Sequence, residues 1–271
     1  MCKKGECSQG AAGILPHQCM REERTCGMGK KGAVHIGTSG WNYDHWKEVF
    51  YPSDLSSDRW LRFYAERFHS VEINNSFYNL PEKKTFEKWR EGTPEDFVFS
   101  VKASRYITHM KKLKEPDDAV KRFLDRAAAL GEKLGPLLFQ LPPRWRCNPE
   151  RLDSFLELQP TEYRYSFEFR DESWLREEVY DILRNHDAAL CIYHLSGFMS
   201  PRELTTDFAY IRLHGPGRAY EGRYDTQSLA GWAGALSAWS RQGISVYCYF
   251  DNDQSGYAVQ NALRLQSMLE E

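Results

Sequence analysis

The chain has 271 residues, of which 41% are hydrophobic and 27% charged, and its formal net charge at pH 7 is −2. This composition excludes the disordered, collagen-like and fibrous classes and predicts a globular protein with a sizeable core. It also lacks the global positive charge of a dedicated nucleic-acid-binding protein, so any anion site must be local.

Residues 1–32 differ in composition from the rest, and we interpret them as a Cys-rich, flexible N-terminal extension of a single barrel domain over residues 33–271. Four of the seven cysteines lie in this extension, without the paired C-x₂₋₄-C spacing that makes a zinc or iron–sulfur prediction strong. Reduced thiols are therefore the preferred interpretation, and metal binding is the weaker alternative. The four cysteines are Cys2, Cys7, Cys19 and Cys26.

The remaining cysteines, Cys147, Cys191 and Cys248, are isolated from one another. Isolated cysteines fit a reducing cytoplasm better than a disulfide framework. The longest apolar stretch near the start, residues 11–15, is too short for a signal-peptide core or a membrane span. We therefore expect a cytoplasmic protein with no membrane partner.

From residue 34 onward, short β-branched and aromatic runs alternate with longer amphipathic segments. The predicted strands are Val34–Thr38, Ser70–Asn74, Phe97–Lys102, Pro136–Leu141, Arg164–Arg170, Ala189–His194, Phe208–His214 and Ser245–Asp251. The predicted helices are Asp58–Phe68, Glu82–Arg90, Asp117–Leu134, Pro149–Leu158, Trp174–Asn185, Thr226–Arg241 and Ser255–Leu269. Their boundary signals are the N-caps Asp58 and Thr226, the first-turn prolines Pro116 and Pro149, and the terminating glycines Gly92, Gly135 and Gly243.

Strands that alternate with helices imply right-handed crossovers and a parallel sheet, and eight such units close into a TIM-type (β/α)₈ barrel. The link between residues 194 and 207 is too short for a full helix, so the helix between strands six and seven should be short or missing. A doubly wound open sheet is the alternative. It is disfavoured because Gly37–Trp41 lacks the G-x-G-x-x-G spacing of a dinucleotide site.

Active sites of such barrels lie at the C-terminal ends of the strands, where this sequence places many polar residues on one strand face. On the eighth strand we favour Tyr247, Tyr249 and Asp251 as the inward face. An inert alternative is a set of salt-bridged layers filling the barrel, with Glu168 and Arg170 simply pairing with each other. The other candidate inward residues are Glu72, Asn74, Ser100, Lys102, Gln140, Arg212 and His214.

The loops that follow the strands add basic and aromatic residues. A Gly- and Arg-rich loop over residues 215–223 includes Arg218 and lies where many barrels bind phosphate, although a flexible surface turn has the same composition. Loops 104–114 and 144–146 are basic. Among the rim aromatics, which otherwise pack the barrel edge, the better ligand candidates are Trp41, Tyr78 and Tyr220.

Six motifs occur in one order along the chain: Gly37–Trp41, Val71–Pro81, Phe139–Pro143, Glu168–Arg170 with Ser173–Trp174, Arg212–Gly215 and Tyr249–Asp253. With these motifs the sequence from about Val34 to Met268 resembles the YecE-like family, also called domain of unknown function 72. The resemblance implies a TIM-type barrel but neither an activity nor a cofactor. Asp171 and Asp251 depart from the histidine and asparagine that we associate with those positions. The family's motifs match here at Glu72, Asn74, Gln140, Glu168, Arg170, Arg212, His214, Asn252 and Asp253.

The leading functional hypothesis is an enzyme performing acid–base chemistry, either hydrolysis or proton transfer, on an anionic, phosphorylated or nucleotide-like substrate. Glu72, Glu168 and His214 are the expected catalytic residues. The expected substrate-binding residues are Asn74, Lys102, Gln140, Arg170, Arg212, Arg218, Tyr78, Trp41 and Asn252.

Three alternatives remain open. No cofactor is required, but Glu72, Glu168, His214 and Asp251 could together bind a divalent metal. A nucleic-acid-binding module could use the basic loops on phosphates and the rim aromatics on bases. Glycoside processing ranks third, because it needs two carboxyl groups flanking the bond.

Overall fold

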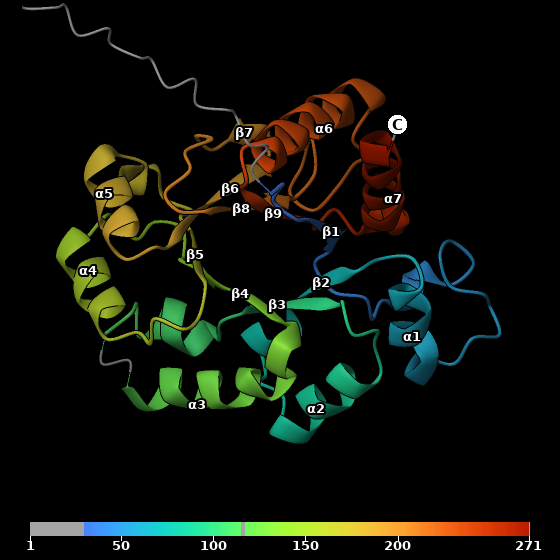
Figure 1. The fold of residues 1–271 in the computed structure, drawn as a ribbon, viewed down its shortest axis with the longest axis horizontal. Coiled ribbons are helices and arrows are strands. Elements are labelled where there is room, and N and C mark those ends of the chain that lie inside the picture. The colour runs from blue at the N-terminus through green and yellow to red at the C-terminus, as the bar shows by residue number, and fades with distance from the viewer. Residues whose placement is uncertain (1–29, 115–116, 271) are drawn as a thin grey trace, which may run out of the picture.

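The protein folds as a (β/α)₈ barrel, as predicted. In the computed structural model, which describes residues 30–114 and 117–270, eight parallel strands follow the order β1-β9-β8-β6-β5-β4-β3-β2 (Figure 1). A parallel bridge between Ser39 and Glu72 joins the two ends of the sheet. The strands are β1 Val34–Thr38, β2 Ser70–Ile73, β3 Val98–Lys102, β4 Leu134–Gln140, β5 Tyr165–Glu168, β6 Ala189–Leu195, β7 Phe198–Met199, β8 Phe208–Leu213 and β9 Ser245–Phe250.

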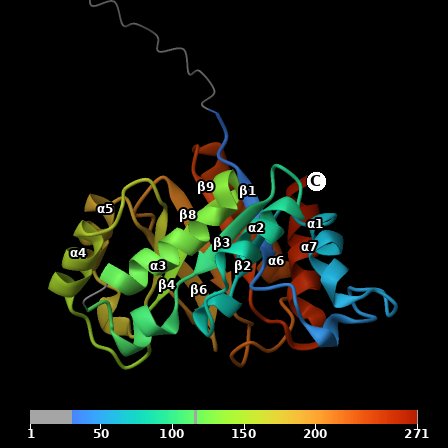
Figure 2. The ribbon, with the colours of Figure 1, turned by 90° about the horizontal axis from the view of Figure 1, so that it is seen from below.

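Helices surround the strands in chain order, and the view turned by 90° shows α2 and α3 crossing in front of β2–β4 (Figures 1 and 2). The α-helices are α1 Trp60–Ala65, α2 Lys83–Glu91, α3 Asp117–Ala127, α4 Pro149–Glu157, α5 Glu177–Asn185, α6 Thr226–Arg241 and α7 Tyr257–Glu270. Shorter turns of helix are η1 Asp44–Trp46, η2 Ser57–Arg59, η3 Asn75–Phe77, η4 Tyr106–Met110, η5 Ala128–Lys133, η6 Glu172–Trp174 and η7 Gln254–Gly256. No helix within residues 30–114 and 117–270 has the length and apolar character needed to cross a membrane.

Several helix boundaries were predicted wrongly. We predicted one helix up to Leu134, but α3 ends at Ala127 and the chain continues as η5. A regular helix cannot run through this segment, because Gly131 has a positive φ of 57°. The next strand then begins at Leu134, so Gly135 lies inside β4 and terminates no helix. The N-cap of α6 is Asp225, whose side chain accepts from the Ser228 amide, and Thr226 is the first helical residue.

Other boundary signals had mixed outcomes. Asp58 lies inside η2 and caps no helix, because η2 precedes α1 directly. Gly92 follows α2, and Gly243, with a φ of 84°, follows α6 as predicted. Pro149 occupies the first turn of α4 as predicted, whereas Pro116 lies outside the described residues.

The connection from β6 to β8 holds no helix, as expected. It contains β7, which pairs antiparallel with β6 through His194–Met199 and Leu195–Phe198. Ser196 and Gly197 turn the chain between these strands with positive φ values, a conformation typical of tight hairpins.

Two packed layers hold the barrel together. One lies between the strands and the helices and is rich in fully buried aromatics such as Trp46, Trp60 and Phe86. The other fills the lower barrel, and Tyr249 hydrogen-bonds there to Ser70 and Ser100 at 2.7 and 2.8 Å. Polar side chains nearer the C-terminal strand ends lie above this second layer. The second layer consists of Leu138, Ala189, Cys191, Tyr193, Phe208, Tyr210, Tyr247 and Tyr249.

Candidate active site

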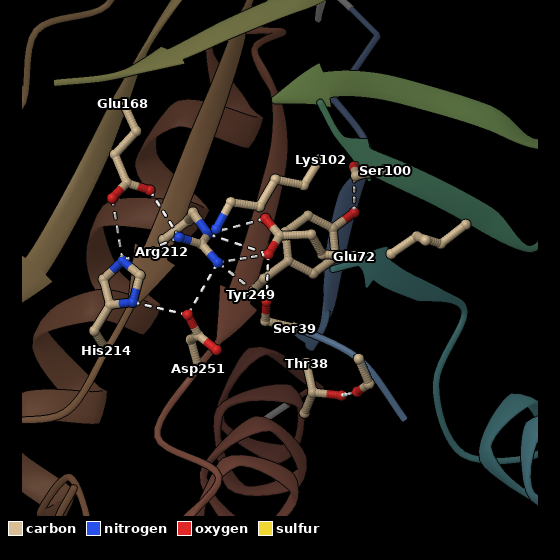
Figure 3. Close-up of polar contacts among 12 residues, drawn as sticks. Thr38, Ser39, Glu72, Ser100, Lys102, Glu168, Arg212, His214, Tyr249 and Asp251 are labelled. Atoms are coloured by element: carbon tan, nitrogen blue, oxygen red, sulfur yellow. Dashed lines mark hydrogen bonds and ion pairs between the residues drawn. The ribbon is translucent and has the colours of Figure 1, made fainter. Parts of the chain in front are cut away.

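Arg212 lies at the centre of a polar network inside the barrel, near the C-terminal ends of the strands (Figure 3). Its Nη2 donates to Glu72 Oε1 at 2.7 Å and to Asp251 Oδ2 at 3.0 Å, and its Nη1 donates to Glu168 Oε2 at 2.8 Å. Arg212, Glu72 and Glu168 have no exposed side-chain surface. One guanidinium therefore links carboxylates that come from three different parts of the sheet.

Glu72 projects from β2 and is fully hydrogen-bonded. Besides Arg212, its carboxylate accepts from the Ser39 hydroxyl and, at 2.7 Å, from the Tyr210 hydroxyl. Ser39 also accepts from Arg212 Nη2 at 3.0 Å. Tyr210 and Arg212 are two residues apart on β8, so the strand's alternation puts both side chains into the barrel interior.

His214 lies between two carboxylates and two guanidinium groups. Its Nδ1 is 2.9 Å from Asp251 Oδ2, and its Nε2 is 3.1 Å from Arg170 Nη2 and 3.3 Å from Arg212 Nη1. Glu168 Oε1 is farther from Nε2, at 3.5 Å. Both ring nitrogens of His214 therefore lie within hydrogen-bonding distance of a charged neighbour.

The two carboxylates nearest His214 are held as anions. Burial alone would raise the pKa of Glu168, but Arg170, Arg212 and His214 outweigh it and keep that pKa well below its usual range. The pKa of Asp251 is lowered in the same way against the effect of burial, chiefly by Arg212. Neither group can serve as a general acid near pH 7, because each is already deprotonated.

These lowered pKa values predict a stability loss in acid. Glu168 and Asp251 stabilise the fold fully above their ordinary carboxyl pKa values, 4.5 for Glu and 3.8 for Asp, and lose that contribution as pH falls toward their folded-state values. We expect the unfolding free energy of Asp251→Asn to fall less steeply below pH 4 than that of the wild type, by up to about 1.4 kcal/mol per pH unit. Urea unfolding between pH 2.5 and 7 measures this slope.

The matched control is Asp207→Asn, because Asp207 is 76% exposed and its weak ion pair with Arg164 spans 3.9 Å. That variant should keep the wild-type slope. Equal slopes for the wild type and Asp251→Asn would contradict the assignment of Asp251 as a buried, charge-stabilised anion.

Lys102 differs from the other charged residues of the network. Its side chain extends from β3 beside Arg212 and Glu72, and the residue is 6% exposed (Figure 3). Its Nζ lies 4.4 Å from the centre of the Phe77 ring and makes no hydrogen bond or ion pair with any residue in the described ranges. Burial, followed by the nearby charge of Arg212, lowers the pKa of Lys102 to about 8. This ammonium therefore lacks a direct counter-ion.

The rim just outside the network is cationic. Burial, and then the positive charges of Lys102, Arg105 and Arg170, lower the pKa of His109 to about 4, so this imidazole is neutral at pH 7. Inside this rim, the carboxylates of Glu72, Glu168 and Asp251 are accompanied by three lysine and arginine cations. These cations are Arg170, Arg212 and Lys102.

Comparison with known proteins places the chain in a family. The family described as "Protein of unknown function DUF72" matches residues 35–271. The chain belongs to the DUF72 family. Similar curated proteins are UPF0759 protein YunF of Bacillus subtilis, 26% identical over 88% of this chain and 95% of YunF, and UPF0759 protein YecE of Escherichia coli, 33% identical over 51% of this chain and 48% of YecE.

A crystal structure of a DUF72 family protein from Thermotoga maritima has a TM-score of 0.80 and 32% identity, covering 88% of this chain and all of that one. A second, from Enterococcus faecalis, has a TM-score of 0.72 at 20% identity, covering 88% of this chain and 96% of that one, and supports the fold alone. The family resemblance that the motifs indicated is confirmed, and so is the barrel.

In this DUF72 protein, most of the predicted inward residues lie together. Gln140 is 8% exposed at the end of β4, in register with Glu168, and Lys102 and Arg170 complete the upper layer. Asp251 and Tyr249 face inward, as favoured, while Phe250 packs toward the helices. Glu168 and Arg170 form an ion pair, as the inert alternative proposed, and both also contact His214.

Most of the other predicted ligand residues lie away from the network, and only Tyr220 among them contacts it. Asn252 turns outward, and its Nδ2 donates to Gly222 O and to Asn261 of α7, at 2.7 and 3.0 Å. Arg218 is exposed, and its side chain forms no hydrogen bond or ion pair with the described residues. Trp41 and Tyr78 line a groove beside the mouth, together with Asn74. Tyr220 lies with its ring edge against His214, at 5.5 Å between centroids.

Several network residues were not predicted from the sequence. Ser39 belongs to a motif considered only for its spacing, and Tyr210 shares the inward face of β8 with Arg212, so strand alternation could have identified it. His109 lies in η4, a helical turn in a loop predicted only to be basic. No sequence signal indicated its place.

The suggested metal ligands do not fit a cation. Among the described residues, no three His, Cys, Asp or Glu side chains converge as a metal site. Glu72, Glu168 and Asp251 each bind Arg212, so the guanidinium occupies the position that a divalent ion would need. Cys2, Cys7, Cys19 and Cys26, the other suggested ligands, lie outside the described residues.

Proposed function

We propose that this DUF72 protein is an enzyme that performs acid–base chemistry on a small anionic substrate at the C-terminal mouth of the barrel. The observation that carries the proposal is Lys102, a nearly buried ammonium without a direct counter-ion, next to a network in which every other charge is paired. Buried charges without partners are costly, and residues with strongly shifted pKa values concentrate at functional sites.

Lys102 is the group best suited to move a proton. Its pKa of about 8 lies near working pH, whereas the pKa values of Glu168 and Asp251 are held too low for an effective base. The fraction of Lys102 that is neutral accepts a proton from the substrate or from an attacking water, and the resulting ammonium returns it to the product. Hydrolysis and proton transfer both fit this cycle.

The remaining network residues hold the site in place. Arg170 is the expected anion ligand, since its side chain is 9% exposed beside the cationic rim. Glu168 contacts both Arg170 and His214, Arg212 contacts His214, and Glu72 holds Arg212 in place. The glycoside alternative gains no support, because Glu72 and Glu168 are both bound to Arg212 and neither is free to flank a bond.

The test is an anion-binding screen with a matched pair of variants. We expect members of a phosphorylated-metabolite panel to raise the melting temperature of the wild type, and Arg170→Met to weaken the best hit by about tenfold or more in calorimetric titration. The control is Arg164→Met. Arg164 directly precedes β5, whereas Arg170 follows it, so Arg164 lies at the opposite end of the barrel, where it contacts Tyr247. A panel without any hit, or equal losses in the two variants, would contradict the proposal.

A further inference from the structure

A groove of about 950 Å³ lies beside the barrel mouth, outside the network. Its walls are the segment after β1, the start of α1, the segment after β2 and one face of α2; α1 and α2 are neighbours beside β2 in Figure 1. Gly40 lines the groove, and its amide donates to Glu72 O at 2.8 Å. The groove therefore ends next to the proposed active site, and its volume suits a ligand of nucleotide size.

Unpaired positive charge dominates the groove. Lys84 and Lys88 are one turn apart on α2, and Arg59 and Arg62 face them from η2 and α1. All four residues are exposed, and none forms an ion pair with another described residue. Asp58 is the only carboxylate in the lining, so the groove carries an excess of three positive charges. A ligand with several negative charges would complement it.

Aromatic rings and an unsatisfied amide line the same groove. Tyr78 is 80% exposed, so its ring is open to a ligand in the groove. Trp41 packs edge-on against Trp89, with 5.1 Å between ring centroids. The side-chain oxygen of Asn74 is buried and accepts no hydrogen bond from the described residues. Such an acceptor lacks the partner that an N–H donor of a ligand could supply, and the exposed ring can stack on a planar heterocycle.

We infer that the groove binds a nucleoside polyphosphate, with the phosphates against Lys84, Lys88, Arg59 and Arg62 and the base near Tyr78 and Asn74. A nucleotide is the ligand class that supplies several negative charges, a stacking ring and N–H donors together. The inference rests on the proposed function in one respect, because it treats the groove as the outer part of the substrate site.

Calorimetric titration of the full chain with ATP and GTP at low salt, without divalent metal, tests the assignment. We expect Lys84→Glu/Lys88→Glu to weaken binding by about tenfold or more, while Lys83→Glu/Lys121→Glu, an equal charge change on exposed lysines outside the groove, has little effect. Tyr78→Ala should weaken ATP about tenfold and leave inorganic tripolyphosphate unchanged.

Each contrary result has a distinct meaning. No nucleotide binding at low salt, or equal losses in the two lysine double variants, would overturn the inference. If tripolyphosphate binds as tightly as ATP, the ligand of the groove is a simple polyanion and not a nucleotide. If a single-stranded oligonucleotide binds but mononucleotides do not, the ligand is a nucleic-acid strand. Phosphometabolite binding that depends on Arg170 would leave the proposed function standing in every one of these cases.

Discussion

Replacing Arg212 with methionine is expected to destabilise the protein by about 3–5 kcal/mol, the cost of breaking a buried ion-pair network by removing one partner. Arg212 is fully buried and binds Glu72, Glu168 and Asp251. Its removal leaves three carboxylates in the barrel with only Arg170 and Lys102 nearby, so uncompensated negative charge remains buried. Urea unfolding followed by circular dichroism at pH 7 measures the loss.

The matched control is Arg184→Met. Arg184 also contacts three carboxylates, those of Glu177, Asp181 and Glu203, but its side chain is 34% exposed. Water screens such pairs, so we expect a loss of about 1 kcal/mol or less. Similar losses for Arg212→Met and Arg184→Met would show that the buried network contributes no more than a surface cluster, contrary to the role of Arg212 as its central cation.

Replacing Lys102 with methionine is expected to act on activity and stability in opposite directions. Turnover of any substrate found in the screen should fall by about 10²–10⁴-fold, the usual contribution of a general acid–base group. The protein should nevertheless become more stable at pH 7, because burial disfavours the ammonium in the folded state. A gain in stability together with a loss of function is what separates a functional lysine from a structural one.

The stability difference between Lys102→Met and the wild type should depend on pH. The pKa of Lys102 is about 8 in the folded state and 10.5 ordinarily, so between these values the unfolded chain binds more protons and the stability of the wild type rises with pH. The advantage of Lys102→Met, on the order of 3 kcal/mol, should be complete below pH 8 and shrink as pH rises toward 10.5. A destabilised variant at pH 7, or a gap independent of pH, would contradict the description of Lys102.

The barrel was predictable from the sequence because its strands are short apolar runs whose ends lie within a few residues of those observed. Local conformation was harder to predict. Gly131 breaks the predicted long helix through its positive φ. From the sequence alone, a glycine within a helical pattern is also compatible with an uninterrupted helix. The hairpin strand β7 is two residues long, which gives no periodicity to detect.

The side chains that face the barrel interior at the site were also predictable, because strand alternation fixes which residues share a face. They include Glu72, Lys102, Glu168 and Arg212. Their pairing was not. Which carboxylates Arg212 would bind depends on how the strands are staggered around the barrel, and that stagger is a property of the closed sheet. Lys102 therefore looked like one anion ligand among several, when it is the only one of these four without an ion pair to a described residue.

The groove illustrates the same limit. Lys84 and Lys88 are recognisable as one helix face, but they come to line one groove with Arg59 and Arg62 only through the positions of α1 and α2 around the barrel. Residues that converge from separate loops carry no common sequence signal. Tyr78, by contrast, was selected from the sequence as a ligand candidate, and the groove gives that choice a location.

The most direct measurement is the titration of Lys102 itself, by carbon-13 NMR of the protein labelled at its lysine side chains, with the resonance assigned by its absence from Lys102→Met. We predict a midpoint near 8, set by burial and by the neighbouring guanidinium of Arg212. A midpoint near the ordinary 10.5 would show that Lys102 is solvated or paired, and would contradict its role as the proton-transfer group of this site.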